Sequence, residues 1–269
     1  MKTCFIIFLC TLLCPLTACY KTTHPLSSNT PTPLPMEEVL EEPSDVWDVS
    51  DVDISEIDTS KKLISFTFDD APAVQFENIL AVFASFNESN PDCKAFATVF
   101  CNGHLCSDSS LLALRTAYAM GFELGNHTHS HFDLTSLSEL ELNEEIDATD
   151  RILEKIDGKS RHLLRAPFGK INEEVKEVSS VPLIDWTIDT LDWTGIPEED
   201  IFEKVFANKQ DGHIVLMHDG NQATVDALKR LLPVLKEEGY QVVSVSQLAK
   251  AHGCVLKRGK VYIRARKQF

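Results

Sequence analysis

The sequence has few basic side chains. Lysine and arginine together number 25 against 41 aspartate and glutamate residues, so the formal net charge of the 269-residue chain is −16 at pH 7. Binding to nucleic acid depends on lysine and arginine to neutralise phosphates. The charge balance therefore argues against a nucleic-acid partner.

Long apolar segments are also missing. The most apolar run, residues 4–13, is shorter than the roughly 20 residues that a membrane-spanning helix needs. Its place after Lys2 is typical of a signal peptide. Leu16-Thr-Ala-Cys19 resembles the cleavage box of bacterial lipoproteins. We predict a lipoprotein signal peptide over 1–18, a lipid on Cys19 and export to the bacterial cell envelope; an ordinary cleavage site is the alternative.

The cysteines do not have the spacing of a structural zinc site. Once the signal and Cys19 are set aside, four remain: Cys93, Cys101, Cys106 and Cys254. The sequence does not decide whether Cys101 and Cys106 form a disulfide, because export permits disulfides without requiring them. A zinc site that uses these cysteines and a histidine lacks a second ligand pair at a useful spacing.

No basic residue lies between Glu37 and Asp58, a segment rich in carboxylates. Prolines, serines and threonines fill the residues before it. Such a segment repels itself and stays extended. We predict an acidic linker over 19–60 that tethers a domain, with docking of the part around Trp47 onto that domain as the alternative.

Apolar strands and amphipathic helices alternate from Lys61 onward. The expected strands cover 63–68, 94–100, 122–124, 162–164, 182–188, 213–217 and 241–244. The expected helices cover 75–86, 109–120, 137–156, 172–178, 198–207 and 224–238, and Ser136 with Glu139 predicts a capping box at the start of the longest. About seven β/α units with short connections favour parallel strands in a closed or nearly closed barrel. We predict a single catalytic domain over 61–250 and a basic hairpin or tail over 251–269, with strands at 254–256 and 261–263.

Ionisable side chains gather where the predicted strands end. In a barrel of parallel strands the loops after the strands share one face, and that face carries the functional site. The residues concerned are Asp69, Asp70, His127, His131, Arg165, Asp189, Asp192, His218 and Asp219. We therefore expect these side chains to converge.

The spacing of two histidines indicates a metal site. His127 and His131 are four residues apart, so a single turn of chain brings both imidazoles to one side. Asp70 offers a third ligand, and three protein ligands leave positions open for water and substrate, as in catalytic zinc sites. We predict one divalent metal, Zn²⁺ first, with Co²⁺ or Ni²⁺ as alternatives. His129 is expected at the rim of this site.

Five motifs in order resemble those of the polysaccharide deacetylase (NodB homology) family, carbohydrate esterase family four. They are Phe66-Thr-Phe-Asp-Asp70, His127-Thr-His-Ser-His131, Arg165-Ala-Pro-Phe168, Asp189-Thr-Leu-Asp-Trp193 and Leu216-Met-His-Asp219. The resemblance covers residues 62–248. It implies an α/β fold, a distorted (β/α)7 TIM-like barrel, and metal-dependent removal of N- or O-acetyl groups from a polysaccharide.

The resemblance also implies catalytic roles. Asp69 would be the general base that acts on a metal-activated water, and His218 the general acid that protonates the leaving amine. Arg165 would pair with Asp69, and its positive charge would offset the repulsion between the two adjacent carboxylates. Asp192 would orient Arg165.

Substrate contacts are implied for Pro167, Phe168, Trp193 and Leu216. A backbone N–H near Phe168 would stabilise the tetrahedral oxyanion, while Trp193 and Leu216 would form an apolar wall around the acetyl methyl group. The chain departs from the family at Ala71, where glycine is usual, and at Phe168, where tyrosine is commoner. An alanine is tolerable there if its φ is negative.

We expect an exported, lipid-anchored, monomeric enzyme that deacetylates a glycan such as peptidoglycan or a chitin-like polymer of N-acetylglucosamine. A related amidohydrolase acting on small amides is one alternative, but the export signal argues against it. A glycan-binding lipoprotein without activity is another, but Asp69 and His218 are both present. No loop has a readable code for one glycan.

Overall fold

A computed structural model describes residues 45–266. The predicted signal peptide over 1–18, Cys19 and the first part of the predicted linker lie outside the described residues, as do residues 267–269. The described residues cluster into one compact unit. Within residues 45–266, none of the helices combines the length and the apolar character needed to cross a membrane.

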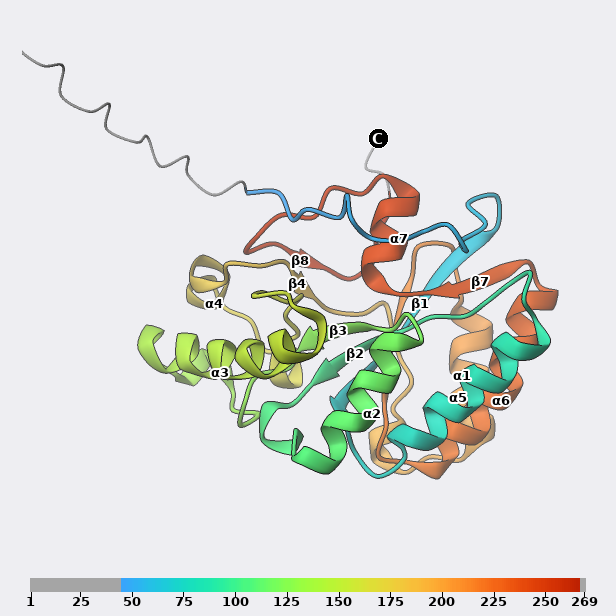
Figure 1. The fold of residues 1–269 in the computed structure, drawn as a ribbon, viewed down its shortest axis with the longest axis horizontal. Helices are drawn as coiled ribbons and strands as arrows, with labels where there is room; N and C mark the ends of the chain where they lie inside the picture. Colours follow the sequence, from blue (N-terminus) through green and yellow to red (C-terminus); the bar gives the residue numbers. More distant parts are fainter. Residues whose placement is uncertain (1–44, 267–269) are drawn as a thin grey trace, which may run out of the picture. The chain divides into compact units, whose positions relative to one another are not determined.

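Parallel strands around β1 form the centre of the fold (Figure 1). The strands are β1 (Lys62–Ala71), β2 (Thr98–Cys101), β3 (Glu123–Asn126), β4 (Leu183–Ile184), β5 (Ile188–Asp189), β6 (Ile214–His218), β7 (Tyr240–Val243) and β8 (Val261–Tyr262). The main sheet has the order β3-β2-β1-β6-β5, and β7 pairs with the first half of β1. Single bridges from Leu164 to Asn126 and to Leu183 link this sheet to the β4–β8 pair. The predicted α/β barrel is confirmed, in a distorted form.

Helices surround the strands (Figure 1). They are α1 (Phe76–Ser89), α2 (Asp108–Ala119), α3 (Glu139–Asp157), α4 (Glu173–Val178), α5 (Glu198–Asn208), α6 (Gln222–Glu237) and α7 (Val245–His252). Short 3-10 turns cover Gly103–Leu105, Leu134–Ser136, Pro167–Gly169 and Asp192–Thr194. In α6 the residues Leu228, Leu231 and Leu235 recur at helical spacing and are fully buried, which explains why this segment packs as a helix on the sheet.

β1 is buried on both faces. Ile64, Phe66 and Phe68 on one face and Ser65 and Thr67 on the other have no exposed surface. A strand covered on both sides is typical of parallel sheets. After the exposed Lys62 at its start, the next accessible position of β1 is Asp70 near its carboxyl end, directly after the buried Asp69.

The predicted capping box at Ser136 and Glu139 is wrong. The box lies at Ser138 and Glu141, where the Glu141 carboxylate accepts the Ser138 N–H at 2.9 Å. The preceding residues form a 3-10 turn that the Asp133 side chain caps through Thr135. Helix α3 therefore begins two residues later than we predicted.

The predicted strands at 162–164 and 182–188 are shorter than expected. The first is reduced to bridges at Leu164, and the second splits into β4 and β5. The carbonyl groups of Ile184 and Asp185 instead accept hydrogen bonds from the Arg165 guanidinium, at 2.9 and 3.2 Å. A buried side chain thus takes acceptors that a regular strand would have used.

The predicted terminal hairpin is wrong. Residues 254–256 form no strand, and β8 pairs in parallel with β4. The chain also forms α7, which sequence reasoning missed although Ser244 and Gln247 make a capping box at its start. These residues therefore complete the fold rather than trail from it.

The end of the predicted linker lies against the domain. Trp47 N–H donates to the Leu256 carbonyl at 2.9 Å, and Ile57 is 8 % exposed. The Lys250 ammonium on α7 donates to the carbonyl of Val52 at 2.8 Å, so the segment runs beside that helix (Figure 1). The structure has the docked arrangement that we gave as the alternative for the part around Trp47.

Candidate active site

Strained backbone marks the face where the strand-end loops meet. In the described part of the chain, five non-glycine residues have a positive φ; one lies at the carboxyl end of β1 and the other four lie in loops and turns that follow strands. They are Asp70, Thr128, His131, Phe168 and Leu191. Such conformations are costly and persist where the surrounding structure fixes them, which is common at functional sites. Ala71 is not among them, so the alanine that departs from the family is tolerated, as predicted.

Three predicted metal ligands come together at this face. One ligand atom from each of Asp70, His127 and His131 lies within 4.8 Å of the others. Asp70 Oδ1 is 3.4 Å from His131 Nε2 and 3.8 Å from His127 Nε2. Across residues 45–266 no other such group of three occurs, so neither His129 nor the cysteines join a cluster. Cys101 and Cys106 are both free thiols.

The donor set suits one divalent cation. His127 Nδ1 lies 2.8 Å from the Arg165 carbonyl, which only accepts hydrogen bonds, so Nδ1 carries a proton. His127 Nε2 is left facing Asp69 Oδ2 and Asp70 Oδ1, 3.7 and 3.8 Å away. A carbonyl behind the outer nitrogen is the usual support for a metal-binding histidine. Two imidazoles and one carboxylate therefore converge on one point, which is a usual donor set for a divalent cation.

The other carboxylate of the pair has a different partner. Asp69 is 3 % exposed, and its Oδ1 accepts a hydrogen bond of 2.7 Å from Arg165. Arg165 is fully buried, donates also to Thr67 Oγ1 at 2.6 Å, and lies over the Phe100 ring. These donations offset the cost of burying the guanidinium. Asp69 Oδ2 is left 3.7 Å from His127 Nε2, beside the ligand group.

Asp192 supports His218 and not Arg165, so our prediction for its partner is wrong. Asp192 Oδ1 lies 2.8 Å from His218 Nδ1, and Oδ2 accepts the His218 N–H at 2.8 Å. The Thr224 hydroxyl also donates to Oδ2, at 2.7 Å. The reason is topological: β5 pairs with β6, so the turn after β5 reaches the end of β6.

The environment of His218 favours its protonated form. Burial lowers the pKa of His218, but the hydrogen bond that His218 donates to Asp192 and the nearby carboxylates of Asp69 and Asp70 outweigh it, so the pKa lies above its usual value. Because Nδ1 faces Asp192, the proton available for transfer is on Nε2. The imidazole can therefore donate a proton near neutral pH.

The predicted substrate-contact residues divide into two groups. Phe168 and Trp193 are more than half exposed, at 63 % and 62 %, whereas Pro167 is buried and Leu216 is 4 % exposed. The Phe168 ring meets His131 edge-on with centroids 4.7 Å apart. Among the described residues nothing accepts the Phe168 N–H, which leaves that donor free for a ligand.

Sequence reasoning missed the residues that support the ligand loop. Glu145 on α3 accepts backbone N–H groups of that loop, and Asn126, at the end of β3, bridges the loop to Asp150. Asn126 stands directly before His127, so its place at a strand end was a usable signal. Nothing in the sequence indicates which side chain of α3 faces the loop.

Comparison with known proteins agrees with this geometry. A family model described as polysaccharide deacetylase matches residues 56–181. The peptidoglycan-N-acetylmuramic acid deacetylase PdaC of Bacillus subtilis is 33 % identical over 192 residues, which cover 71 % of this chain and 40 % of that protein. A peptidoglycan-N-acetylglucosamine deacetylase of Bacillus cereus is 32 % identical over 204 residues, which cover 72 % of this chain and 92 % of the relative.

The fold gives the same result. The structure of PdaC from Bacillus subtilis aligns with a TM-score of 0.66 and 32 % identity, over 72 % of this chain and 93 % of that one. The chain spans less than half the length of the first curated relatives that it matches.

Proposed function

The chain belongs to the polysaccharide deacetylase family, and we propose that it is a metal-dependent enzyme that hydrolyses N-acetyl groups of a polysaccharide. The observation that carries this proposal is the division between two adjacent carboxylates. Asp70 faces two histidines, while Asp69 beside it is held by Arg165. The names of the relatives favour peptidoglycan or a chitin-like polymer of N-acetylglucosamine as the substrate. The same site chemistry would also serve O-acetyl groups.

Asp70, His127 and His131 would hold the cation, with Zn²⁺ first and Co²⁺ or Ni²⁺ as alternatives. When bound, a divalent cation polarises a carbonyl group and lowers the pKa of water. The position of His127 Nε2, 3.8 Å from Asp70 Oδ1, supports this assignment.

The two remaining ionisable pairs divide the proton transfers. Arg165 fixes Asp69 Oδ1, and Oδ2 is free to accept a proton from the attacking water. Asp192 fixes His218 Nδ1, so that Nε2 can donate a proton to the leaving amine. Asp69 thus serves the proton transfer from water, and Asp192 supports the proton transfer to the leaving amine.

The acetyl group would lie between the exposed aromatic residues. The free N–H of Phe168 would stabilise negative charge on the carbonyl oxygen, as donors in oxyanion holes do. Trp193 and Leu216 would contact the acetyl methyl group, and Pro167 would fix the turn that carries Phe168.

We also propose that the enzyme acts outside the cytoplasm as a lipid-anchored monomer. The signal over 1–18 and the lipid on Cys19 are inferred from the sequence. The peptidoglycan deacetylases among its relatives support a substrate in the cell envelope. The acidic segment within 19–60 would span part of the distance between the membrane and the domain.

The proposed roles of the carboxylate and histidine are separable by mutation. We expect Asp69→Asn to lower acetate release from an acetylated glycan about 10²–10⁴-fold, because it removes the proton acceptor. Cation binding should persist, since Asp69 lies outside the ligand group. His127→Ala should lose both acetate release and cation binding. Acetate release and cation content are measured on the same samples.

Two results would contradict this assignment. Substantial acetate release by Asp69→Asn would show that another group accepts the proton. Unchanged cation content in His127→Ala would show that the ligands are elsewhere. A glycan-binding protein without activity would release no acetate even in its unaltered form.

A further inference from the structure

One carboxylate anchors the loop between the two histidine ligands. Glu145 Oε2 accepts the N–H of His129 at 3.0 Å and the N–H of Ser130 at 2.7 Å. Glu145 belongs to α3, whereas the loop follows β3. A single oxygen atom thus fixes two consecutive peptide groups that lie between His127 and His131.

A second anchor also originates on α3. Thr128 N–H donates to Asn126 Oδ1 at 2.8 Å, and Asn126 Nδ2 donates to Asp150 Oδ1 at 2.8 Å. Asn126 and Asp150 are both buried, at 0 % and 2 % exposure. Asp150 is held in turn by His162 Nδ1, 2.9 Å away. Two carboxylates of one helix therefore hold the loop, one directly and one through Asn126.

The loop needs this support because its backbone is strained. Thr128 and His131 have φ values of 65° and 57°. A β-branched residue at positive φ is a genuine outlier that persists only where its surroundings hold it. The remaining loop N–H, that of His131, donates to Thr128 Oγ1 at 3.2 Å, so the loop supplies little support from within. The Gly103 and His104 N–H groups donate to the carbonyls of Thr128 and His129, at 2.9 Å each, and the anchors on α3 hold the loop from its N–H side.

We propose that Glu145 is a positioning residue for the cation site. It fixes the peptides between His127 and His131 so that both imidazoles face Asp70 before the cation binds. This inference rests on the proposed function, because it assumes that the three ligands bind a cation. Preorganised ligands bind more tightly because less freedom is lost on binding.

Three variants of the full chain separate geometry from charge. Glu145→Gln keeps an acceptor oxygen at the same distance from α3 but loses the charge. Glu145→Asp keeps the charge but is one methylene too short to reach both N–H groups. Glu144→Ala is the matched control, since Glu144 is exposed on the same helix and makes no hydrogen bond to a described side chain or peptide through its carboxylate.

The test is cation binding to metal-free protein, measured by titration with Zn²⁺ in a calorimeter and with Co²⁺ by visible absorption. Loss of support around metal ligands commonly costs 10–100-fold in affinity. We expect Glu145→Asp to weaken binding about tenfold or more and to change the Co²⁺ spectrum. Glu145→Gln should stay within about threefold of the unaltered protein, and Glu144→Ala should match it.

Equal affinity in Glu145→Asp and the unaltered protein would overturn the inference. Weaker cation binding in Glu145→Gln alone would also overturn it, because that result would mean that the charge of Glu145, and not its position, matters. If the unaltered protein binds neither ion, the proposed function fails and this inference fails with it. Thermal unfolding of each metal-free variant shows whether it is folded before titration.

Discussion

At the scale of the residue, two neighbouring aspartates with separate partners explain the site. Asp69 and Asp70 directly follow the apolar run that predicts a buried strand over 63–68, so the sequence predicted that they lie at its rim, and the structure has them near the carboxyl end of β1. It also predicted their meeting with His127 and His131, because loops after parallel strands share one face. The partner of Asp192 was not predictable in this way, since it depends on which strands are neighbours in the sheet.

Asp192 provides a prediction about pH. A histidine that acts as a general acid must be protonated, so activity falls as the pH rises through the pKa of His218. Asp192 raises that pKa. In Asp192→Asn the pKa falls, and the alkaline limb of kcat/KM against pH should move to lower pH.

The same change should leave the acidic limb in place, because Asp69 does not contact Asp192. Profiles of acetate release from pH 5 to pH 10 measure both limbs. An alkaline limb that stays where it is in the Asn variant would remove His218 from the role of general acid.

At the scale of the element, long periodic helices were predictable and short strands were not. The apolar stripes of α3 and α6 mark them as helices in the sequence, and only their ends differ from the prediction. β4 and β5 are two residues each, because the Arg165 guanidinium takes the carbonyl groups of Ile184, the last residue of β4, and of Asp185 after it. The contact between Arg165 and Ile184 joins segments 19 residues apart, so no local sequence pattern predicts it.

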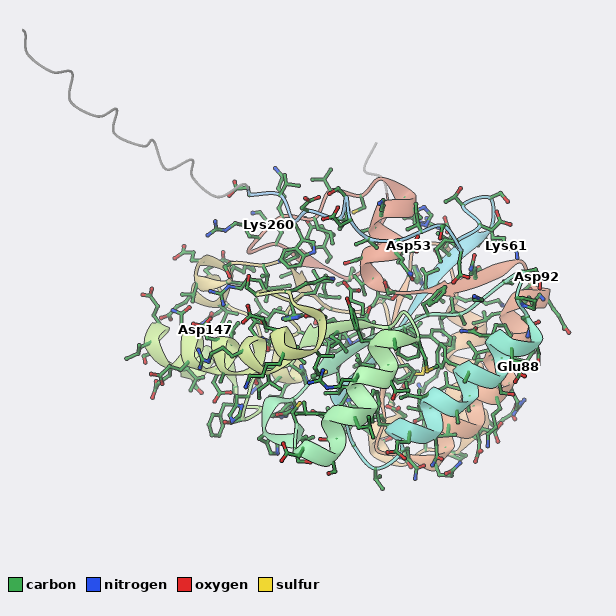
Figure 2. All side chains as sticks on the ribbon, viewed as in Figure 1. Asp53, Lys61, Glu88, Asp92, Asp147 and Lys260 are labelled. Atoms are coloured by element: carbon green, nitrogen blue, oxygen red, sulfur yellow. The ribbon has the colours of Figure 1, made fainter. Side chains whose placement is uncertain are left out.

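Helix α3 also carries a buried charge cluster. His162 Nδ1 lies 2.9 Å from Asp150 Oδ1 and its Nε2 lies 3.2 Å from Asp157, both on α3. Arg161 pairs with Asp150 and with Asp147, which Figure 2 labels on the same helix. Burial lowers the pKa of His162, but the two aspartates outweigh it and raise the pKa above its usual value.

This cluster predicts a pH-dependent stability. Because the pKa of His162 is higher in the folded state, its stabilisation is complete below the ordinary histidine pKa of about 6.5 and is lost as the pH rises through the raised pKa. Breaking a buried ion pair costs about 3–5 kcal/mol. His162→Gln should therefore lower the free energy of unfolding by about that amount at pH 5.5 and by less at pH 9.

Urea denaturation at the two pH values measures the difference. A loss of stability that is equal at both would mean that His162 is neutral in the folded protein and contributes through packing alone.

At the scale of the whole molecule, the barrel and the segment before it form one unit. Residues 45–60 lie beside α7 and bury Ile57, while β8 completes the sheet near β4 (Figure 1). The carboxylates of this segment favoured an extended tether, and its apolar residues around Trp47 gave docking only as the alternative, which is the arrangement in the structure. Residues at or after the ends of β1, β3, β5 and β6 nevertheless meet in pairs at one site, which the alternation of strands and helices did predict.

The central claim is that the cation site and Asp69 together remove acetyl groups from a glycan. Its most direct test is acetate release by the purified full chain from acetylated peptidoglycan and chitin oligomers, first after chelation and then with Zn²⁺ or Co²⁺ restored. The account predicts no release without metal and recovery with either ion. Full release in the chelator, or none from any acetylated glycan with metal present, would contradict it.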